Sequence, residues 1–197
     1  MTENNWTESI CNKITKEFNK EGLEAKVLVD MPYAHEILTY KIENDSKSQK
    51  NKLKAKKEED VLFETDLVIY EKEGEIIKPR VVIEAKINSV TTHDAITYSY
   101  KAEKHKSITP YLRYGIMLGN RGEYPLPGRL FRHGTNFDFM FSFSGEEPTN
   151  QEWRSFVEMI NNEVIYSKQL EQMLVDTRKK GRKHYYMMQK KIELKEL

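Results

Sequence analysis

The segment RVVIEAKI at positions 80–87 constrains the fold more than any other part of the sequence. Its β-branched residues and regular alternation predict a strand. Alternation places Glu84 and Lys86 on one face of that strand and leaves the other face wholly apolar. A carboxylate and an ammonium at the end of an apolar strand cost free energy unless they pair with each other or bind a ligand. The segment therefore predicts both a strand and a candidate site for chemistry.

A second expected strand, residues 66–70, begins with another acid. A charged turn at 71–75 would join the two strands as an antiparallel hairpin, in which Asp66 can lie beside Glu84. Two carboxylates held close together repel, which raises the pKa of one of them unless a cation lies between them. Hard oxygen ligands of this kind suit Mg²⁺. The hairpin therefore predicts a metal site.

Elements expected around the hairpin complete a mixed α/β pattern. Thr7 is a candidate N-cap for a helix that ends near Asn19, and Thr91, Thr92 and Asp94 favour a helix start near residue 92. We expect the following elements before residue 120: a helix over 7–19, a short strand over 26–29 closed by Met31-Pro32, the hairpin, a helix over 92–105, and a strand over 114–118.

The remaining third of the chain is expected to be mainly helical. A loop over 121–128 precedes two strand-like runs, at 129–132 and 137–143. Thr149 and Glu152 have capping-box spacing ahead of a long apolar stripe, which predicts either one helix or two. The basic end of the chain, from Arg178, is expected to be helical as well. No internal repeat and no linker is evident, which indicates one domain.

At this point the sequence resembles a known family. Thr65-Asp66, followed after an apolar run by Glu84-Ala85-Lys86, is similar to the PD-(D/E)XK signature of restriction-endonuclease-like nucleases. The order helix, strand with Asp, strand with Glu-x-Lys, helix, strand is that of the family core. One departure is Thr65, which stands where the family name has proline.

The resemblance spans roughly residues 7–120 and implies an α/β fold. The expected architecture is a restriction-endonuclease-like core with a central mixed β-sheet flanked by helices and a helical C-terminal region. Residues 1–197 would form a single nuclease-like domain, with its core at about 7–145 and a C-terminal helical elaboration at about 149–197.

The resemblance also implies roles for the site residues. Asp66 and Glu84 would hold one or two Mg²⁺ ions, for which Mn²⁺ can substitute, and the backbone carbonyl of Ala85 would be a further ligand. Lys86 would orient the attacking water and offset charge in the transition state. The family often adds a Glu from its first helix. The acidic candidates for such a supporting role are Glu8, Glu17 and Glu64.

Basic residues suggest where DNA would bind. Three of them share one face of the 92–105 helix by i, i+3, i+4 spacing, where they either contact phosphates or form a solvated basic face. Arginines near residues 120–132 are candidates for base contacts. The basic, aromatic C-terminal end either contacts DNA or packs as a helix on a dimer mate. The candidates are Lys101, Lys104, His105, Arg113, Arg121, Arg129, Arg132, Arg182 and Lys183.

Residues 43–60 are almost wholly polar, and seven lysines lie between Lys41 and Lys57. One interpretation is a solvated loop or a fraying helix. The other is a mobile arm that meets an anion. The sequence leaves both open.

Three functions fit these observations. The leading hypothesis is a Mg²⁺-dependent DNA endonuclease most like a type II restriction enzyme, expected to be a homodimer because two symmetric active sites cut both strands of a palindrome. A second is a junction-resolving or repair nuclease, or a nuclease subunit of a defence system. A third, of another class, is a non-catalytic DNA-binding or assembly protein with this fold.

Composition limits the remaining classes. The sum of 32 basic and 31 acidic residues hides separate blocks, because residues 178–197 hold eight basic and two acidic side chains. Near-neutral charge therefore excludes only a uniformly basic protein. The single cysteine, Cys11, lies in a helical apolar pattern and fits a core position in a reducing, cytoplasmic setting. The sequence predicts no membrane span, no signal peptide and no organic cofactor.

Overall fold

The computed structural model describes residues 1–19, 22–45, 50–181, 184–189 and 192–196. Its elements are α1 (Glu3–Phe18), β1 (Leu23–Asp45), β2 (Lys50–Glu73), β3 (Ile76–Ile87), α2 (Thr92–Ile108), β4 (Arg113–Gly119), α3 (Gly128–His133), β5 (Phe139–Ser142) and α4 (Asn150–Asp176). The strands form one sheet in the order β1-β2-β3-β4-β5. The pairs β1–β2 and β2–β3 are antiparallel, and the pairs β3–β4 and β4–β5 are parallel.

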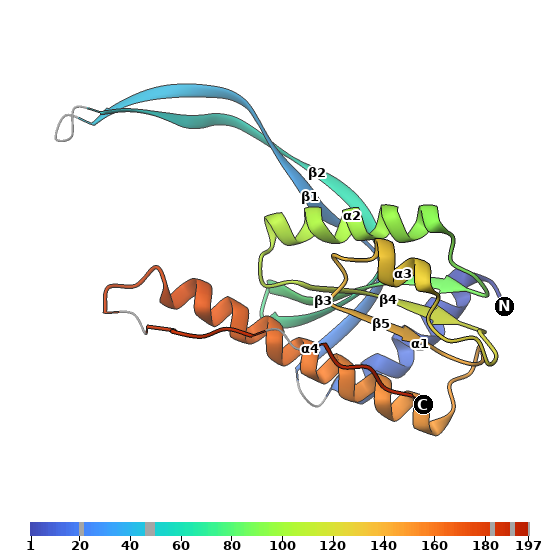
Figure 1. Ribbon diagram of the computed structural model, residues 1–197. Coiled ribbons are helices and arrows are strands. Elements are labelled where there is room, and N and C mark those ends of the chain that lie inside the picture. The colour runs from blue at the N-terminus through green and yellow to red at the C-terminus, as the bar shows by residue number, and fades with distance from the viewer. Residues whose placement is uncertain (20–21, 46–49, 182–183, 190–191, 197) are drawn as a thin grey trace.

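Helices cover both faces of this mixed sheet (Figure 1). The larger apolar core joins one face of the sheet to α1 and α4, through side chains such as Trp6, Ile83 and Phe156. Two smaller clusters join the opposite face to α2 and α3, through side chains such as Val82 and Leu130. The α/β architecture predicted from the sequence is therefore confirmed: a central mixed sheet flanked by helices, with a long helix in the C-terminal region.

Several local predictions are confirmed. A turn at Gly74 joins β2 to β3 as an antiparallel hairpin. Thr91 and Asp94 form a complete capping box at the start of α2. Thr149 and Glu152 form another at the start of α4, which is one helix of 27 residues rather than two.

The start of the first helix differs from the prediction. Helix α1 begins at Glu3, four residues before the predicted start, and its N-cap is Thr2, whose side chain accepts a hydrogen bond from the Asn5 amide. Thr7 is buried inside the helix, where its hydroxyl donates to the Glu3 carbonyl at 2.8 Å. Because the Thr7 hydroxyl bonds to a carbonyl one turn earlier in the same helix, it does not cap the helix as predicted.

Two predictions for the C-terminal half are wrong. The strand expected at 129–132 lies within the short helix α3, which follows Pro127 as its N-cap residue. The helix expected from Arg178 is absent from the described residues, since 184–189 and 192–196 have no regular secondary structure. Ile192 and Leu194 are 92% and 76% exposed, so the described part of this stretch has no buried apolar face to stabilise a helix.

The first two strands extend far beyond the sheet. Their pairing runs from Leu23 opposite Glu71 to Asp45 opposite Lys50, and its distal part projects from the body as a two-stranded ribbon (Figure 1). We call residues 34–45 and 50–61 the arm. The expectation of a loop or fraying helix over 43–60 is therefore wrong for the described residues, and positions 46–49 lie outside them. Among the described residues, no helix has the length and apolar character needed to cross a membrane.

Candidate active site

The register of the β2–β3 hairpin brings two carboxylates together. Leu67 pairs with Ile83, so the next opposed positions are Asp66 and Glu84. The Asp66 carboxylate accepts a hydrogen bond from the Ala85 amide at 2.7 Å. Asp66 is half-buried, whereas Glu84 is fully buried. The structure thus produces the juxtaposition that the hairpin predicts.

Glu84 is buried with only half of its carboxylate satisfied. Its Oε1 atom lies 2.7 Å from Lys101 Nζ and accepts a hydrogen bond from the Tyr114 hydroxyl. Its Oε2 atom is enclosed and has no hydrogen-bond partner among the described residues. Burial raises the pKa of Glu84 to about 7, Lys101 opposes this rise, and the charge of Asp66 adds to it. An enclosed oxygen without a partner is the feature that a cation would satisfy.

Lys86 is held at the edge of the site by the first helix. Its Nζ atom lies 2.9 Å from Glu3 Oε1, and the other Glu3 oxygen accepts from the Ile87 amide at 3.3 Å. The Lys86 ammonium also stands 5.4 Å from the ring centroid of Tyr98 on α2. Burial disfavours the charged ammonium, but hydrogen bonds to Tyr98 and Glu3 outweigh it and raise the pKa of Lys86. Lys86 is therefore a fixed cation.

A small cavity of about 60 Å³ opens beside Asp66. It lies between the first turns of α1 and strand β1, at a point where Leu28 has a left-handed backbone conformation with φ of 53°. A non-glycine residue in this conformation interrupts regular strand geometry. The cavity has room for a few water molecules. Its lining residues are Glu3, Asn4, Thr7, Glu8, Val27, Leu28 and Asp66.

The site fits a hard cation that keeps most of its water. Asp66 and Glu84 supply two carboxylates, and the Glu84 Oε2 atom lacks a partner. Mg²⁺ typically binds one or two carboxylates and fills its other positions with water and phosphate oxygens. No group of three or more His, Cys, Asp or Glu side chains within the described residues forms a ready-made metal cage.

The three supporting acids proposed from the sequence lie in different places. Glu8 is exposed and lines the cavity beside Asp66. Glu17 lies at the far end of α1, about 21 Å along the helix axis from Glu3, so it is too far away to join the site. The Glu64 side chain is exposed, and its backbone carbonyl accepts from Lys101 at 2.9 Å.

Three of the cations expected to face DNA lie inside the protein instead. Lys101 pairs with Glu84, and His105 is fully buried, with its Nδ1 atom 3.0 Å from the Pro32 carbonyl. Arg113 forms ion pairs with Asp138 at 3.1 Å and with Glu163. These side chains satisfy internal partners and do not present a surface to DNA, which corrects the expectation for all three. Lys104 is half-buried, 5.0 Å from the ring centroid of Tyr100.

Two of the remaining candidates, Arg121 and Arg129, contact the chain just after β3. Arg121 donates to the Asn88 carbonyl, and Arg129 donates to the Val90 carbonyl at 3.1 Å. Arg129 and Arg132 are exposed. Arg182 and Lys183 lie outside the described residues.

Glu3, Tyr114 and Lys101 have roles at the site that were not predicted from the sequence. Thr2 followed by an acid is a capping signal, and it could have placed Glu3 in a first helical turn. Tyr114 could have been found from the parallel β3–β4 register, in which Glu84 pairs with Ile116, two positions away on the same face. No sequence signal pairs Lys101 with Glu84, because helix α2 meets the sheet only through the tertiary fold.

The chain is similar in structure to a known restriction endonuclease, at low sequence identity. No family model matches the chain, and no curated protein matches it. One solved structure with a similar chain is that of the pre-specific restriction endonuclease BsaWI in complex with DNA, with a TM-score of 0.43 and 10% sequence identity. The alignment covers 82% of this chain and 61% of the other, so the chain spans about three fifths of that protein's length. A similarity at this level assigns neither a family nor an activity.

Proposed function

We propose that this protein is a Mg²⁺-dependent endonuclease that hydrolyses phosphodiester bonds in DNA. The observation that best supports the proposal is the unpartnered Oε2 atom of Glu84, enclosed beside Asp66 and two residues before Lys86 on the same strand. A purely structural ion pair would satisfy both oxygens, because a buried acceptor without a partner costs free energy. Two carboxylates with a neighbouring ammonium are instead the groups that phosphodiester hydrolysis needs.

Each residue has a distinct role in this proposal. Asp66 and Glu84 would hold Mg²⁺, with the Ala85 carbonyl as a further ligand and with water and phosphate oxygens in the other positions. When bound, the ion would polarise the phosphate and lower the pKa of a water molecule. Lys86 orients that water and offsets negative charge in the transition state. Glu3 positions Lys86.

Lys101 and Tyr114 act on the other side of the Glu84 carboxylate. Both bind Oε1, so they fix the orientation of the group and leave Oε2 for a ligand. This arrangement also means that Lys101 partly neutralises Glu84 before any metal binds. Removing that ammonium would leave two neighbouring carboxylates without a counter-charge.

The first test is incubation of the purified protein with plasmid DNA and Mg²⁺, with EDTA in a parallel reaction. We expect cleavage with Mg²⁺ and none with EDTA. Glu84→Gln and Lys86→Ala should abolish cleavage while circular dichroism and the melting temperature show a folded chain. Glu17→Gln, an equally conservative change at the far end of α1, should cleave at the wild-type rate. Full activity in Glu84→Gln would refute the proposal.

The cleavage pattern separates the enzymatic alternatives. Discrete fragments would support an enzyme like a type II restriction endonuclease, for which a symmetric dimer is expected. A smear, or activity limited to branched DNA, would support a junction-resolving or repair nuclease. Absence of cleavage on duplex, branched and single-stranded DNA would favour a binding or assembly protein.

A further inference from the structure

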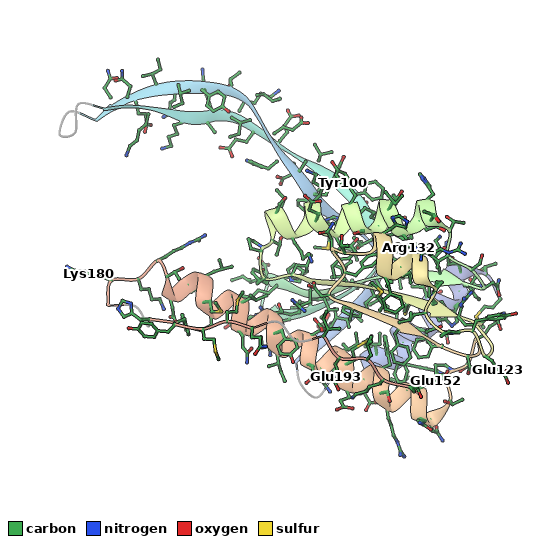
Figure 2. All side chains as sticks on the ribbon, viewed as in Figure 1. Tyr100, Glu123, Arg132, Glu152, Lys180 and Glu193 are labelled. Atoms are coloured by element: carbon green, nitrogen blue, oxygen red, sulfur yellow. The ribbon has the colours of Figure 1, made fainter. Side chains whose placement is uncertain are left out.

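The arm is a two-stranded ribbon whose side chains are mostly exposed to solvent. Figure 2 shows side chains projecting from both of its faces, away from the layered body. Ile42 and Leu53 are 68% and 67% exposed. A two-stranded ribbon without further packing is only marginally stable in water. Binding of a partner along the arm would therefore stabilise it.

The pairing register sorts the distal arm into two chemically different faces. Directly opposed residues share a face, and the faces alternate along each strand. One face carries the apolar pairs Tyr40–Ala55 and Ile42–Leu53. The other carries the pairs Lys41–Lys54 and Glu43–Lys52, and a register shift between Thr39 and Tyr40 interrupts the alternation beyond them. We call the second the lysine face.

The lysine face holds more positive charge than its own acids balance. Lys41 lies directly opposite Lys54. Both ammonium groups pair with the same Glu43 carboxylate oxygen, Lys41 Nζ at 3.0 Å and Lys54 Nζ at 3.6 Å. Lys52 has no ion-pair partner among the described residues. Like charges at directly opposed positions destabilise a ribbon. Local stability therefore does not explain this pattern, whereas an anion that binds along the face does.

The arm leaves the sheet next to the candidate active site. Strand β2 carries Asp66 within the sheet and Lys54 twelve residues earlier in the arm. At about 3.3 Å per residue, the two are separated by at most about 40 Å. One turn of B-DNA rises about 35 Å. A duplex that is bound at Asp66 and runs along the arm would therefore reach the lysine face about one helical turn away.

We infer that the arm is a second DNA-binding element whose lysine face contacts backbone phosphates about one turn from the bond to be cleaved. This inference rests on the proposed function, because it takes DNA as the substrate. A ribbon with several ammonium groups on one face suits backbone phosphates, and such contacts carry no base specificity. The arm would thus add affinity and fix the direction of the duplex.

A pair of matched double variants tests the inference. Lys52→Gln with Lys54→Gln removes two charges from the lysine face and relieves the repulsion of Lys41. Lys16→Gln with Lys72→Gln removes two exposed charges from α1 and from the opposite end of β2. DNA binding is measured by fluorescence anisotropy in EDTA, so that cleavage does not interfere.

The arm variant should bind a duplex of about 40 base pairs roughly tenfold more weakly than wild type at about 0.1 M salt. When log Kd is plotted against the logarithm of the salt concentration, the slope for the arm variant should be smaller by about 1.8, because two fewer phosphates are neutralised. The control variant should stay close to wild type. On a duplex of about 10 base pairs, too short to reach the arm, both variants should bind alike. Equal binding of the two variants to the long duplex would overturn the inference.

Two further outcomes separate this inference from its alternatives. In the first, the double variant Ile42→Ser with Leu53→Ser converts a dimer to a monomer in sedimentation, while the lysine variant binds DNA normally. That result would mean that the arm joins two copies of the chain, and it would overturn the inference. Cleavage with Mg²⁺ is scored separately. An arm-dependent affinity without cleavage would refute the nuclease and support the arm as a DNA-binding element.

Discussion

Glu84 can carry a charge in the folded protein only because other groups compensate for its burial. Lys101 and Tyr114 serve one oxygen, and the other is left unpartnered. Replacing Glu84 by an apolar residue would leave Lys101 buried without its counter-ion, which is costly. Glutamine is the better probe, because it removes the charge and keeps a polar group of similar shape.

The Glu3–Lys86 contact lies nearer the surface and serves a different purpose. The two side chains are 33% and 21% exposed, and exposed ion pairs contribute only about 0.2–1 kcal/mol to folding. The main effect of this ion pair is therefore to position the Lys86 ammonium, which it holds between α1 and α2.

Glu3→Gln should separate positioning from stability. We expect the cleavage rate to fall by about 10- to 100-fold, as is typical when a residue that orients an active-site group is changed. The free energy of unfolding in urea should change by less than about 1 kcal/mol. Affinity for DNA in EDTA should be unchanged.

Glu8→Gln is the matched control for that experiment. Glu8 lines the same cavity, but it is exposed and has no ion-pair partner among the described residues. Its substitution should leave the cleavage rate within about twofold of wild type, since surface changes away from specific contacts have small effects. If both variants lose activity equally, the cavity as a whole matters and the assignment of Glu3 is wrong.

At the scale of elements, the N-terminal turn of α1 is positioned by close packing against β4. The Trp6 ring lies against Gly119, where an added Cβ would come within 2.5 Å of it. Trp6 also donates to the Glu146 carbonyl at 2.9 Å and packs edge-on against Phe143. Glu3 lies one turn before Trp6, so this packing determines where its carboxylate stands.

Gly119→Ala should therefore affect both stability and activity. Overpacking typically costs about 1–3 kcal/mol, which for a chain of this length lowers the melting temperature by roughly 2–12 °C. Displacement of α1 should also slow cleavage, because Glu3 moves with Trp6. Gly128→Ala is the control: it begins α3, its new Cβ would come no closer than 3.4 Å to Arg132, and it should change neither property. A fully stable, fully active Gly119→Ala would show that α1 does not depend on this contact.

How far the sequence predicts each element depends on how local its signals are. The capping boxes at Thr91 and Thr149 and the alternation of β3 are short-range patterns, and the structure contains all three elements. An arm was one of two open interpretations of residues 43–60, but its strands were not predicted, because neither of its faces is buried in the chain and the usual contrast between apolar and polar positions is weak. Its lysines also have low β-propensity.

The candidate site divides in the same way. Asp66 and Glu84 were predicted to be neighbours from hairpin geometry alone, since register follows from the turn. Lys101 was assigned to a surface because helix periodicity identifies which residues share a face but not what that face packs against. Only the docking of α2 on the sheet reveals that this ammonium serves Glu84.

At the scale of the whole molecule, many of the charged residues in the sequence form ion pairs within the fold. The basic block over 86–121 holds six basic and two acidic residues. Three of its cations, Lys101, Lys106 and Arg113, pair with Glu84, Asp138 and Glu163. This block is therefore mainly structural. The lysine face of the arm, by contrast, meets solvent, so position in the fold and not net charge identifies the candidate DNA surface.

The burial of Glu84 makes global stability depend on pH and on metal. The pKa of Glu84 is about 7 in the folded chain, against an ordinary value of 4.5. Between these values the folded state holds a proton that the unfolded state has released, so unfolding becomes easier as pH rises through this window. A shift of this size corresponds to about 3 kcal/mol, present below pH 4.5 and lost by about pH 7. Measured in EDTA by urea denaturation, wild type should lose stability relative to Glu84→Gln over this range.

Mg²⁺ should reverse that loss, because it binds the ionised carboxylate. At pH 8 and a Mg²⁺ concentration of about ten times its Kd, binding adds about 1.4 kcal/mol, which raises the melting temperature of a chain this size by roughly 3–6 °C. The gain should disappear below about pH 6, where Glu84 is protonated and the ion must displace a proton. Glu84→Gln should show no gain at either pH. An equal Mg²⁺ shift in wild type and Glu84→Gln would mean that the ion binds elsewhere, and the unpartnered oxygen would then need another explanation.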